Sequence, residues 1–317
     1  MLQIILLHAL FGSSIPMSKF LLSMVSPIWL TGIRMSLAGV ILLAYNRIQK
    51  THFTLDKKHW WYYVQIIFFG VYLKYVLRNW GLMHMSAAKM SFLLNISPFF
   101  AALFSYFAFN ELLSKKQWGG LILGFLGIVP LLLLSSPAEK LMGELLVLSW
   151  PECAILFAVA SHTYSIIVMR KLVRDNNYSA GMTNGIRMFG GGLLALVTAF
   201  MVEGSLIVQS PVTFCWWLAI LIIVSNIMCH NFYIHLLKHY SATFLSFTDF
   251  LSPLFTAVYG WLFFNELITW HYYVSGIAVM VGLFLFYQDE LFNTSTENKK
   301  IFSGFFPQWM TQLVKRA

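Results

Sequence analysis

Charged residues are scarce in this chain. Of its 317 residues, only 10% are Asp, Glu, Lys or Arg, whereas about 25% are charged in an ordinary soluble domain. Hydrophobic residues make up 59%, and stretches such as 121–134 have no polar face. A soluble helical protein needs polar faces on its helices. The composition therefore excludes that class and predicts a membrane protein.

Cysteines are few, and motifs for catalysis are missing. The three cysteines, Cys153, Cys215 and Cys229, lack the spacing of metal ligands, so we predict no disulfide framework, metal site or cofactor. The chain has no nucleophile elbow, phosphate-binding loop or paired catalytic carboxylates. These absences argue against an enzyme and against direct coupling to ATP.

Long apolar segments dominate what is present. A stretch of roughly 20 apolar residues crosses a bilayer as a helix, and a helix satisfies its own backbone hydrogen bonds in lipid. Ten such segments occur, at residues 2–21, 28–46, 61–81, 86–109, 117–135, 145–169, 180–202, 214–237, 241–264 and 268–287. The predicted fold is an all-α integral membrane protein with ten transmembrane helices.

Positive charge is unevenly distributed between the two sets of loops. Ten of the 21 Lys and Arg residues lie in alternate short loops, whereas Lys140 is the clear case in the opposite loops. The ten are Arg47, Lys50, Lys57, Lys58, Lys115, Lys116, Arg170, Lys171, Arg174 and Lys238. Basic loops face the cytoplasm, so we expect a multi-pass protein of a bacterial-type inner membrane with both termini cytoplasmic. The net charge of +9 then reflects topology, and no nucleic-acid partner is predicted.

The chain contains an internal duplication. Residues 86–112 and 241–267 agree at 12 of 27 positions at an offset of 155, and Gly-Ile-Arg-Met at 32–35 recurs at 185–188, an offset of 153. Each copy has five spans, and an odd number inverts the second copy in the membrane. We predict a first five-helix repeat at 1–135, an outside loop at 136–144, an inverted second repeat at 145–288, and a cytoplasmic tail with an amphipathic segment at 289–317.

The order of motifs in both copies resembles the EamA unit of the drug/metabolite transporter superfamily. Each copy has Ser-Ala, then Ser-Pro-x-Phe-x-Ala, then Phe-Asn-Glu-Leu, then a last span that contains glycines. Arg34 and Arg187 match the arginine that such units carry early in their second helix. The Phe-Asn-Glu sequence departs from the usual small-Gly-Glu and leaves the subfamily open. The resemblance implies a ten-helix transporter that works by alternating access, and S-adenosylmethionine transporters are one group in the superfamily.

Charged residues inside the predicted spans are candidates for substrate binding. Lys74 lies near the middle of the third span, Asp249 near the middle of the ninth, and Glu152 some five residues from the middle of the sixth. A charge at the bilayer centre costs about 2.5–3.5 kcal/mol on insertion scales and therefore usually has a function. The alternative is a structural ion pair of Lys74 with either acid. Arg34 and Arg187 suit architecture or gating as well as substrate contact.

Uncharged polar residues and two prolines complete the candidate site. The polar candidates for substrate binding are Asn95, His162, Tyr164 and Asn226. For each of them, an interhelical hydrogen bond is the alternative role. Pro98 and Pro253 fall in the middle of their spans, where a proline frees an upstream carbonyl. We predict paired kinks that line a central cavity and serve as gates, with a plain packing kink as the alternative.

The sequence favours a secondary transporter of a small organic metabolite. A cavity with two acids and several aromatic side chains suits a cationic or zwitterionic solute with a planar ring. S-adenosylmethionine or an amino acid meets that description, and a multidrug or amine exporter is the alternative. Outside transporters, the alternatives are a receptor or an intramembrane enzyme. Coupling to protons or to a counter-substrate is open, and we expect a monomer or weak dimer in the bilayer.

Overall fold

The part of the chain that the computed structural model describes is almost entirely helical. The described residues are 2–49, 56–85, 87–94, 96–110, 112–127, 144–145, 148–237, 240, 245, 248–264, 274, 277–278, 281–282 and 285. The predicted tail, residues 136–143 of the predicted outside loop, Asn95 and most of the predicted tenth span lie outside them.

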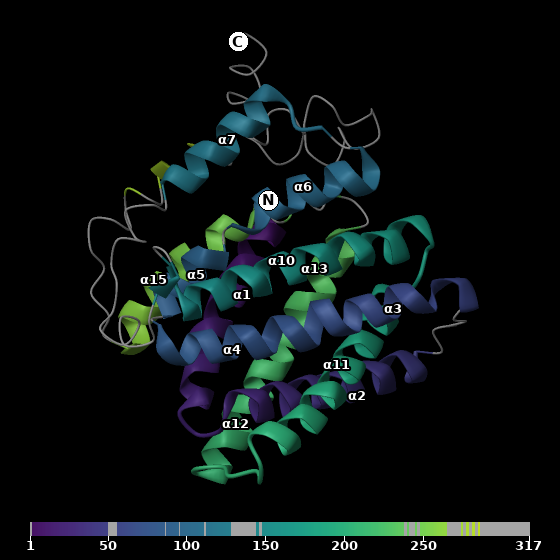
Figure 1. Ribbon diagram of the computed structural model, residues 1–317, viewed down its shortest axis with the longest axis vertical. Coiled ribbons are helices and arrows are strands. Elements are labelled where there is room, and N and C mark those ends of the chain that lie inside the picture. Colours follow the sequence, from purple (N-terminus) through teal and green to yellow (C-terminus); the bar gives the residue numbers. More distant parts are fainter. Residues whose placement is uncertain are drawn as a thin grey trace.

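The described part of the first half of the chain consists of two long helices followed by shorter helical elements. They are α1 (Leu2–Leu22), α2 (Pro27–Ile48), the short turn η1 (Lys57–His59), α3 (Trp60–Ile67), the π-helical segment η2 (Phe68–Leu73), α4 (Lys74–His84), α5 (Ala87–Leu94), α6 (Ser97–Phe109) and α7 (Lys115–Leu126). The elements α3, η2 and α4 follow one another without a break and form one rod in Figure 1. The polar residues of α4 are thus carried in the middle of a long helix.

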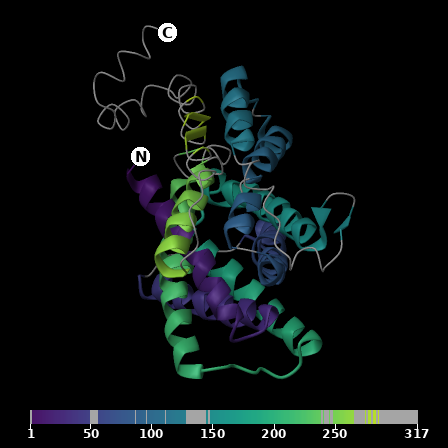
Figure 2. The ribbon, with the colours of Figure 1, turned by 90° about the vertical axis from the view of Figure 1, so that its left-hand side faces the viewer.

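The second half begins with a two-residue antiparallel ladder and continues as helices. The elements are β1 (Glu144–Leu145), β2 (Leu148–Ser149), α10 (Trp150–Arg170), the π-helical η3 (Lys171–Asp175), α11 (Ala180–Val202), α12 (Pro211–Leu221), the π-helical η4 (Ile222–Cys229), α13 (His230–Leu236), the 3-10 turn η5 (Asp249–Leu251) and α15 (Ser252–Phe264). Figure 2 shows α12, η4 and α13 as one continuous green rod. A π-helical segment therefore interrupts both this rod and the rod built from α3 and α4.

Five of the described helical stretches are long and apolar enough to span a membrane. They are Ile4–Leu22, Pro27–Ile48, Trp150–Asp175, Ala180–Val202 and Pro211–Leu236. Large apolar side chains such as Phe107, Phe200 and Trp216 are exposed on the outside of the fold. In a membrane these side chains face lipid, so their exposure carries no penalty. The structure thus agrees with a protein that crosses the membrane several times.

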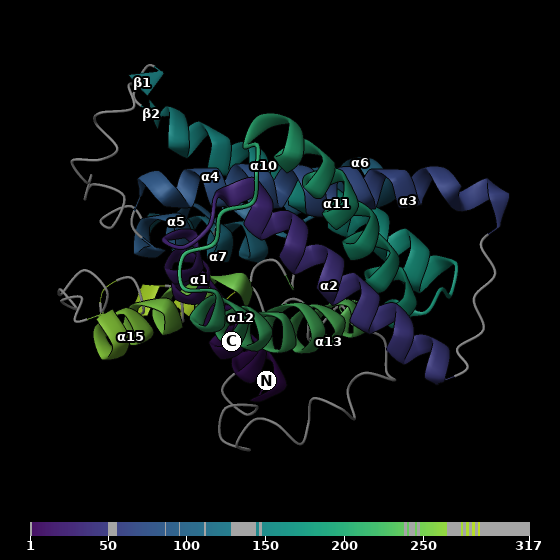
Figure 3. The ribbon, with the colours of Figure 1, turned by 90° about the horizontal axis from the view of Figure 1, so that it is seen from below.

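The helices α2 and α11 lie side by side in Figures 1 and 3 and approach each other closely. The backbone of Gly39 packs against Phe189, and that of Gly192 packs against Ser36, so that a Cβ atom at either glycine would overlap its neighbour. Without a hydrophobic force between helices in lipid, close backbone packing at small residues is what holds them together. The pair α2 and α11 is therefore closely packed along its backbones.

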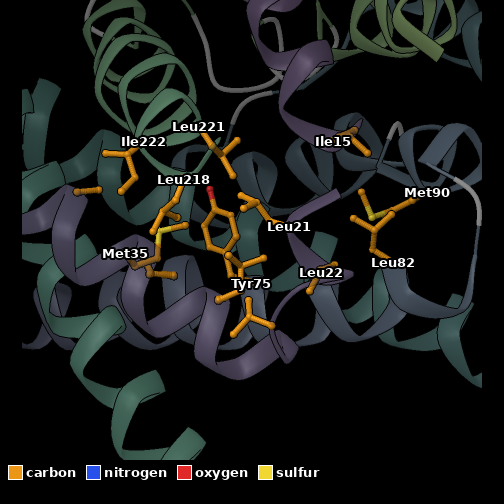
Figure 4. Close-up of a cluster of buried hydrophobic side chains, with 14 of the residues drawn as sticks. Ile15, Leu21, Leu22, Met35, Tyr75, Leu82, Met90, Leu218, Leu221 and Ile222 are labelled. Atoms are coloured by element: carbon orange, nitrogen blue, oxygen red, sulfur yellow. The ribbon is translucent and has the colours of Figure 1, made fainter. Parts of the chain in front are cut away.

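A cluster of buried apolar side chains from α1, α2, α4 and α12 surrounds the ring of Tyr75 (Figure 4). Leu21, Met35, Leu218 and Leu221 lie around this ring. Tyr75 itself is only 1% exposed. This packing fixes the ring beneath the polar side chains that are described below.

The predicted start of the sixth span is wrong, and both prolines lie in the first turns of helices. The helix of the sixth span begins at Trp150, not at 145, because Ser149 caps it and Pro151 occupies its first turn, where a missing N–H costs nothing. Glu152 is therefore at a helix end. Pro98 and Pro253 likewise stand at the starts of α6 and α15. Pro98 follows a turn at Ile96, and Pro253 follows the 3-10 turn η5 without a break in the described helical path, so the kinks stay a prediction.

Candidate functional site

A cavity lies between the helices, and the charge of its wall is unbalanced. Among the described lining residues, Lys74 and Arg78 of α4 and Arg187 of α11 are cations, whereas Asp249 of η5 supplies the one carboxylate. Serine hydroxyls, aromatic rings and imidazoles make up much of the remainder. The second predicted acid, Glu152, is not among the described residues of the wall, where one acid and three cations are found.

Lys74 and Arg78 reach the cavity from one face of α4, because residues four apart on a helix are neighbours. Both are only 7% exposed. The ammonium of Lys74 donates to Nε2 of His162 on α10 at 3.0 Å and lies 4.7 Å from the centre of the Tyr75 ring. Among the described residues, no carboxylate pairs with Lys74. The predicted structural ion pair with Asp249 or Glu152 is thus not found there.

The guanidinium of Arg78 has an edge without a protein partner. Its Nε and Nη2 atoms are buried and make no hydrogen bond with the described residues. The same is true of two further buried atoms in the wall, Nδ1 of His162 and Oγ of Ser97. Buried polar atoms are nearly always hydrogen-bonded, so four such atoms around one cavity indicate a place for a ligand.

Arg187 enters the cavity from α11 and is 4% exposed. Its Nε donates to Oδ1 of Asn184 at 2.8 Å, and Asn184 in turn donates to Oδ1 of Asn231 on α13 at 2.9 Å. Gly70 of η2 lies beside this guanidinium: a Cβ added there would be in ordinary contact with Nη1, at 3.5 Å, but would overlap the side chain of Ser165 on α10. The bare backbone of Gly70 therefore makes room for Ser165, with Arg187 next to both.

Asp249 lies in the turn just before α15, and its carboxylate faces a buried imidazole. Its Oδ1 is 3.5 Å from Nδ1 of His8 on α1. His8 is also held by Ser252 through Nδ1 at 3.1 Å and by Thr248 through Nε2 at 2.8 Å. The Asp249 side chain is 28% exposed. It can therefore accept a hydrogen bond from a cationic group that enters the cavity.

Tyr75 and His230 link α4 to α13 at the wall of the cavity. The Tyr75 hydroxyl and Nε2 of His230 are 2.9 Å apart, and Nδ1 of His230 is 2.6 Å from the Ser225 carbonyl. Because a carbonyl only accepts, Nδ1 carries the hydrogen and the tyrosine donates to Nε2. The faces of the Tyr75 ring then remain for cations: Arg34 lies 5.3 Å from its centre, in addition to Lys74.

Arg34 and Asn226, both predicted at the site, lie behind it. Arg34 is 1% exposed and donates from Nε to Oδ1 of Asn226 at 2.7 Å, from Nη2 to Ser225 at 2.8 Å and from Nη1 to Ser18 at 3.3 Å. The Asn226 amide nitrogen is 3.2 Å from Sδ of Met35. These contacts join α1, α2 and η4, so Arg34 acts as a clamp between helices.

Two other predicted residues, Glu152 and Tyr164, are not among the described residues of the cavity wall, and the place of a third is not described. Glu152 accepts from the backbone of Ser149 at 2.6 Å and closes the capping box of α10. Tyr164 donates to Oε1 of Gln65 at 2.9 Å. Asn95 lies outside the described residues. Of the predicted substrate-binding residues, the structure thus brings together Lys74, His162, Arg187 and Asp249.

The cavity also contains residues outside the predicted substrate-binding set, chiefly Arg78, His230 and Ser97. Arg78 had a usable signal, because its spacing of four from Lys74 places both on one helix face. His230 is conspicuous as a polar residue in an apolar span, but its partner Tyr75 belongs to the other half of the chain. His8 has no such signal, because its place beside Asp249 depends on the packing of α1 against η5.

Comparison with known proteins gives a consistent result. The model of the EamA-like transporter family matches residues 1–133 and 149–288. A Chlamydia muridarum protein named S-adenosylmethionine/S-adenosylhomocysteine transporter is 33% identical over 260 residues, which is 81% of either chain. The uncharacterized transporter YoaV of Bacillus subtilis is 22% identical over 289 residues, 90% of this chain and 95% of that one. One crystal structure aligns with a TM-score of 0.68 at 15% identity, over 90% of this chain and 93% of the other, which is a likeness of fold alone.

Proposed function

This chain belongs to the EamA-like transporter family, and from that premise we propose that it is a secondary transporter of S-adenosylmethionine-type solutes that works by alternating access. It is a multi-pass membrane transporter and not an enzyme. The observation that carries the proposal on the solute is the cavity in which three cations and a carboxylate lie together. The predicted membership of the drug/metabolite transporter superfamily is confirmed by the family match.

The chemistry of the cavity matches a zwitterion with an aromatic ring. S-adenosylmethionine has an ammonium, a sulfonium, a carboxylate and a planar adenine. Asp249 offers a partner to a cationic group, Lys74 and Arg78 offer partners to the carboxylate, and the rings of Phe11 and Tyr233 also line the space. The name of the Chlamydia relative supports the same class of solute. A purely cationic solute fits less well, because it would meet three like charges.

The size of the cavity supports a mechanism in which helices move. The cavity has a volume of about 110 Å³. One water needs roughly 10–15 Å³, so the cavity has room for several waters. Pockets for larger organic ligands are typically about 300–1,000 Å³. A nucleoside-sized solute therefore requires the walls to separate. In alternating access they do so toward one side of the membrane at a time.

We propose that the full architecture is ten helices in two inverted repeats, at 1–135 and 145–288. Contacts between α2 and α11 support it. Gly39 packs against Phe189, and Gly192 packs against Ser36. At the 153-residue offset, Gly192 is the counterpart of Gly39, and Phe189 is the counterpart of Ser36. The two contacts are therefore the same contact, made once from each repeat. Such reciprocity is expected where a two-fold axis passes through an interface.

The bond between Tyr75 and His230 supports the same axis. The two residues are 155 positions apart, which is the offset of the repeat between 86–112 and 241–267. Residues that contact their own counterparts lie next to the axis that relates the copies. The cavity wall at this bond would then be at the repeat interface, where substrate sites of such transporters lie.

The π-helical segments offer places for the helices to move. Shifted by 155 residues, η4 overlaps η2, so the two interruptions are counterparts. Arg34 of the first half contacts Ser225 in η4, and Arg187 of the second half lies beside Gly70 in η2. Short π-helical segments often occur at functional sites. We propose that these segments, together with the helix starts at Pro98 and Pro253, form the gates.

Localisation and coupling complete the proposal. We place the protein in a bacterial-type inner membrane, with both termini and the basic loops on the cytoplasmic side. Transport is coupled to protons or to a counter-substrate, and the protein is a monomer or weak dimer. An amino-acid or multidrug exporter is the alternative within the family, and the nature of the solute decides between them.

The experiment is uptake into liposomes that contain the purified full-length protein. Labelled S-adenosylmethionine should enter, and internal S-adenosylhomocysteine should speed entry if a counter-substrate is the coupling partner. A pH gradient should speed it if protons are. Empty liposomes are the control. No uptake of either compound, together with uptake of a lipophilic amine, would overturn the proposal in favour of the multidrug alternative.

A further inference from the structure

We propose that Arg78, Lys74 and His162 form an anion-binding subsite that takes the carboxylate of the transported solute. The proposal rests on the proposed function, because it names which part of a zwitterionic solute binds where. It assigns the main polar contact to Arg78. The acid Asp249, with His8 behind it, is left for the cationic end of the same solute.

The charge balance of the cavity is the first argument. Lys74, Arg78 and Arg187 are each at most 7% exposed, and no described carboxylate pairs with any of them. The one described carboxylate at the cavity, Asp249, faces the imidazole of His8 at 3.5 Å, and it acts on Lys74 only across the cavity, without an ion pair. A buried charge without a partner costs several kcal/mol. An anionic group from outside the protein would supply the missing partner.

The unpaired hydrogen-bond donors are the second argument. Nε and Nη2 of Arg78 stand next to each other on one edge of the guanidinium, and both lack a partner among the described residues. This edge matches the two oxygens of a carboxylate, so both bonds can form at once. A lone chloride could also accept from both groups, but it lacks the second acceptor atom that makes the two bonds parallel.

His162 adds a third donor. Charged Lys74 can only donate, so Nε2 of His162 accepts from it. The imidazole hydrogen is then on Nδ1, which is buried in the described structure without a partner. The hydroxyl of Ser97, also without one, lies in the same wall. Donors thus outnumber acceptors on this side of the cavity, as expected for an anion site.

Tyr75 holds the subsite in shape before a solute arrives. Its ring centre is 4.7 Å from the Lys74 ammonium and 5.8 Å from the Arg78 guanidinium, and its hydroxyl is engaged by His230. Packed apolar side chains fix the ring from below (Figure 4). Cations held over an aromatic face need little reordering on binding. The two charges are therefore presented side by side.

Binding of matched ligands to the purified full-length protein tests this. S-adenosylmethionine and its decarboxylated analogue share the sulfonium and the adenine and differ in the carboxylate. We expect the analogue to bind about 10- to 100-fold more weakly, by calorimetry. Arg78→Gln should weaken S-adenosylmethionine by a similar factor and leave the analogue unchanged. The matched control is Arg47→Gln, the same change at an exposed arginine outside the cavity, which should change neither.

Equal binding of the two ligands to the wild-type protein, or an equal loss for both in Arg78→Gln, would overturn the subsite. Arg78→Lys provides a folded variant if Arg78→Gln does not fold. Its affinity for S-adenosylmethionine should lie between those of the wild-type protein and Arg78→Gln. If the wild-type protein binds neither S-adenosylmethionine nor S-adenosylhomocysteine, the proposed function fails. Phenylalanine against phenethylamine, with inorganic phosphate as a free anion, then tests the subsite alone. If Arg78→Gln changes the affinity for none of these probes, the subsite is refuted.

Discussion

Arg34 and Arg187 occupy equivalent positions in the two sequence repeats, yet the same substitution should affect them differently. Arg34 donates to three side chains and lies behind the cavity. Arg187 lines the cavity and, among the described residues, donates to Asn184. We expect Arg34→Lys to lower the stability of the protein and Arg187→Lys to lower its affinity for the solute.

The magnitudes follow from the hydrogen bonds. Lysine keeps the charge but lacks the guanidinium fork, and a hydrogen bond to a charged group contributes about 1.5–3 kcal/mol. Arg34→Lys loses about two such bonds, roughly 3–6 kcal/mol, whereas Arg187→Lys loses one, about 1.5–3 kcal/mol. At about 2–4 °C per kcal/mol for chains of some 200 residues, the Arg34 variant should melt roughly 3–12 °C below the Arg187 variant.

Thermal unfolding of the purified protein in detergent, followed by tryptophan fluorescence, measures the first effect. Calorimetric binding of S-adenosylmethionine below the melting temperature measures the second. Arg47→Lys, at an exposed position near the end of α2, is the matched control and should alter neither. Equal melting of the two variants, or an Arg34→Lys protein that melts like the wild type but no longer binds, would refute the reasoning.

Asp249→Asn should abolish most uptake of S-adenosylmethionine in liposomes, whereas Glu152→Gln should keep uptake and lose about 0.5–2 kcal/mol of stability as a weakened helix cap; the reverse pattern would move the acid site to α10. In a cysteine-free background, Lys57→Cys should react with an impermeant maleimide only after cells are opened, and labelling of intact cells would invert the topology. Pro98→Ala and Pro253→Ala should shift apparent solute affinity, measured from one side, in opposite directions by about 1–3 kcal/mol. Shifts in one direction would leave both prolines as helix starts without a gating role.

Several elements show why sequence reasoning reached part of the site. Lys74 and Asp249 were found because a charge in an apolar span is costly and therefore conspicuous. Glu152 was conspicuous for the same reason but sits at a helix start, because the Ser149 cap and Pro151 end the ladder and begin α10 there. Arg34 and Asn226 were correctly singled out as unusual, but their mutual bond, across 192 residues of sequence, turns them toward each other and away from the cavity.

The sequence by itself determined the membrane class, the duplication and the family, because these depend on composition and on matches along the chain. Lipid accepts only segments that are apolar and long, so the membrane-spanning segments can be recognised from the sequence alone. Only the tertiary structure decided which polar groups are paired and which are left open. Arg34 is satisfied by three partners, while the edge of Arg78 has none among the described residues. That difference depends on atoms from opposite halves of the chain meeting within hydrogen-bond distance, which no local pattern encodes.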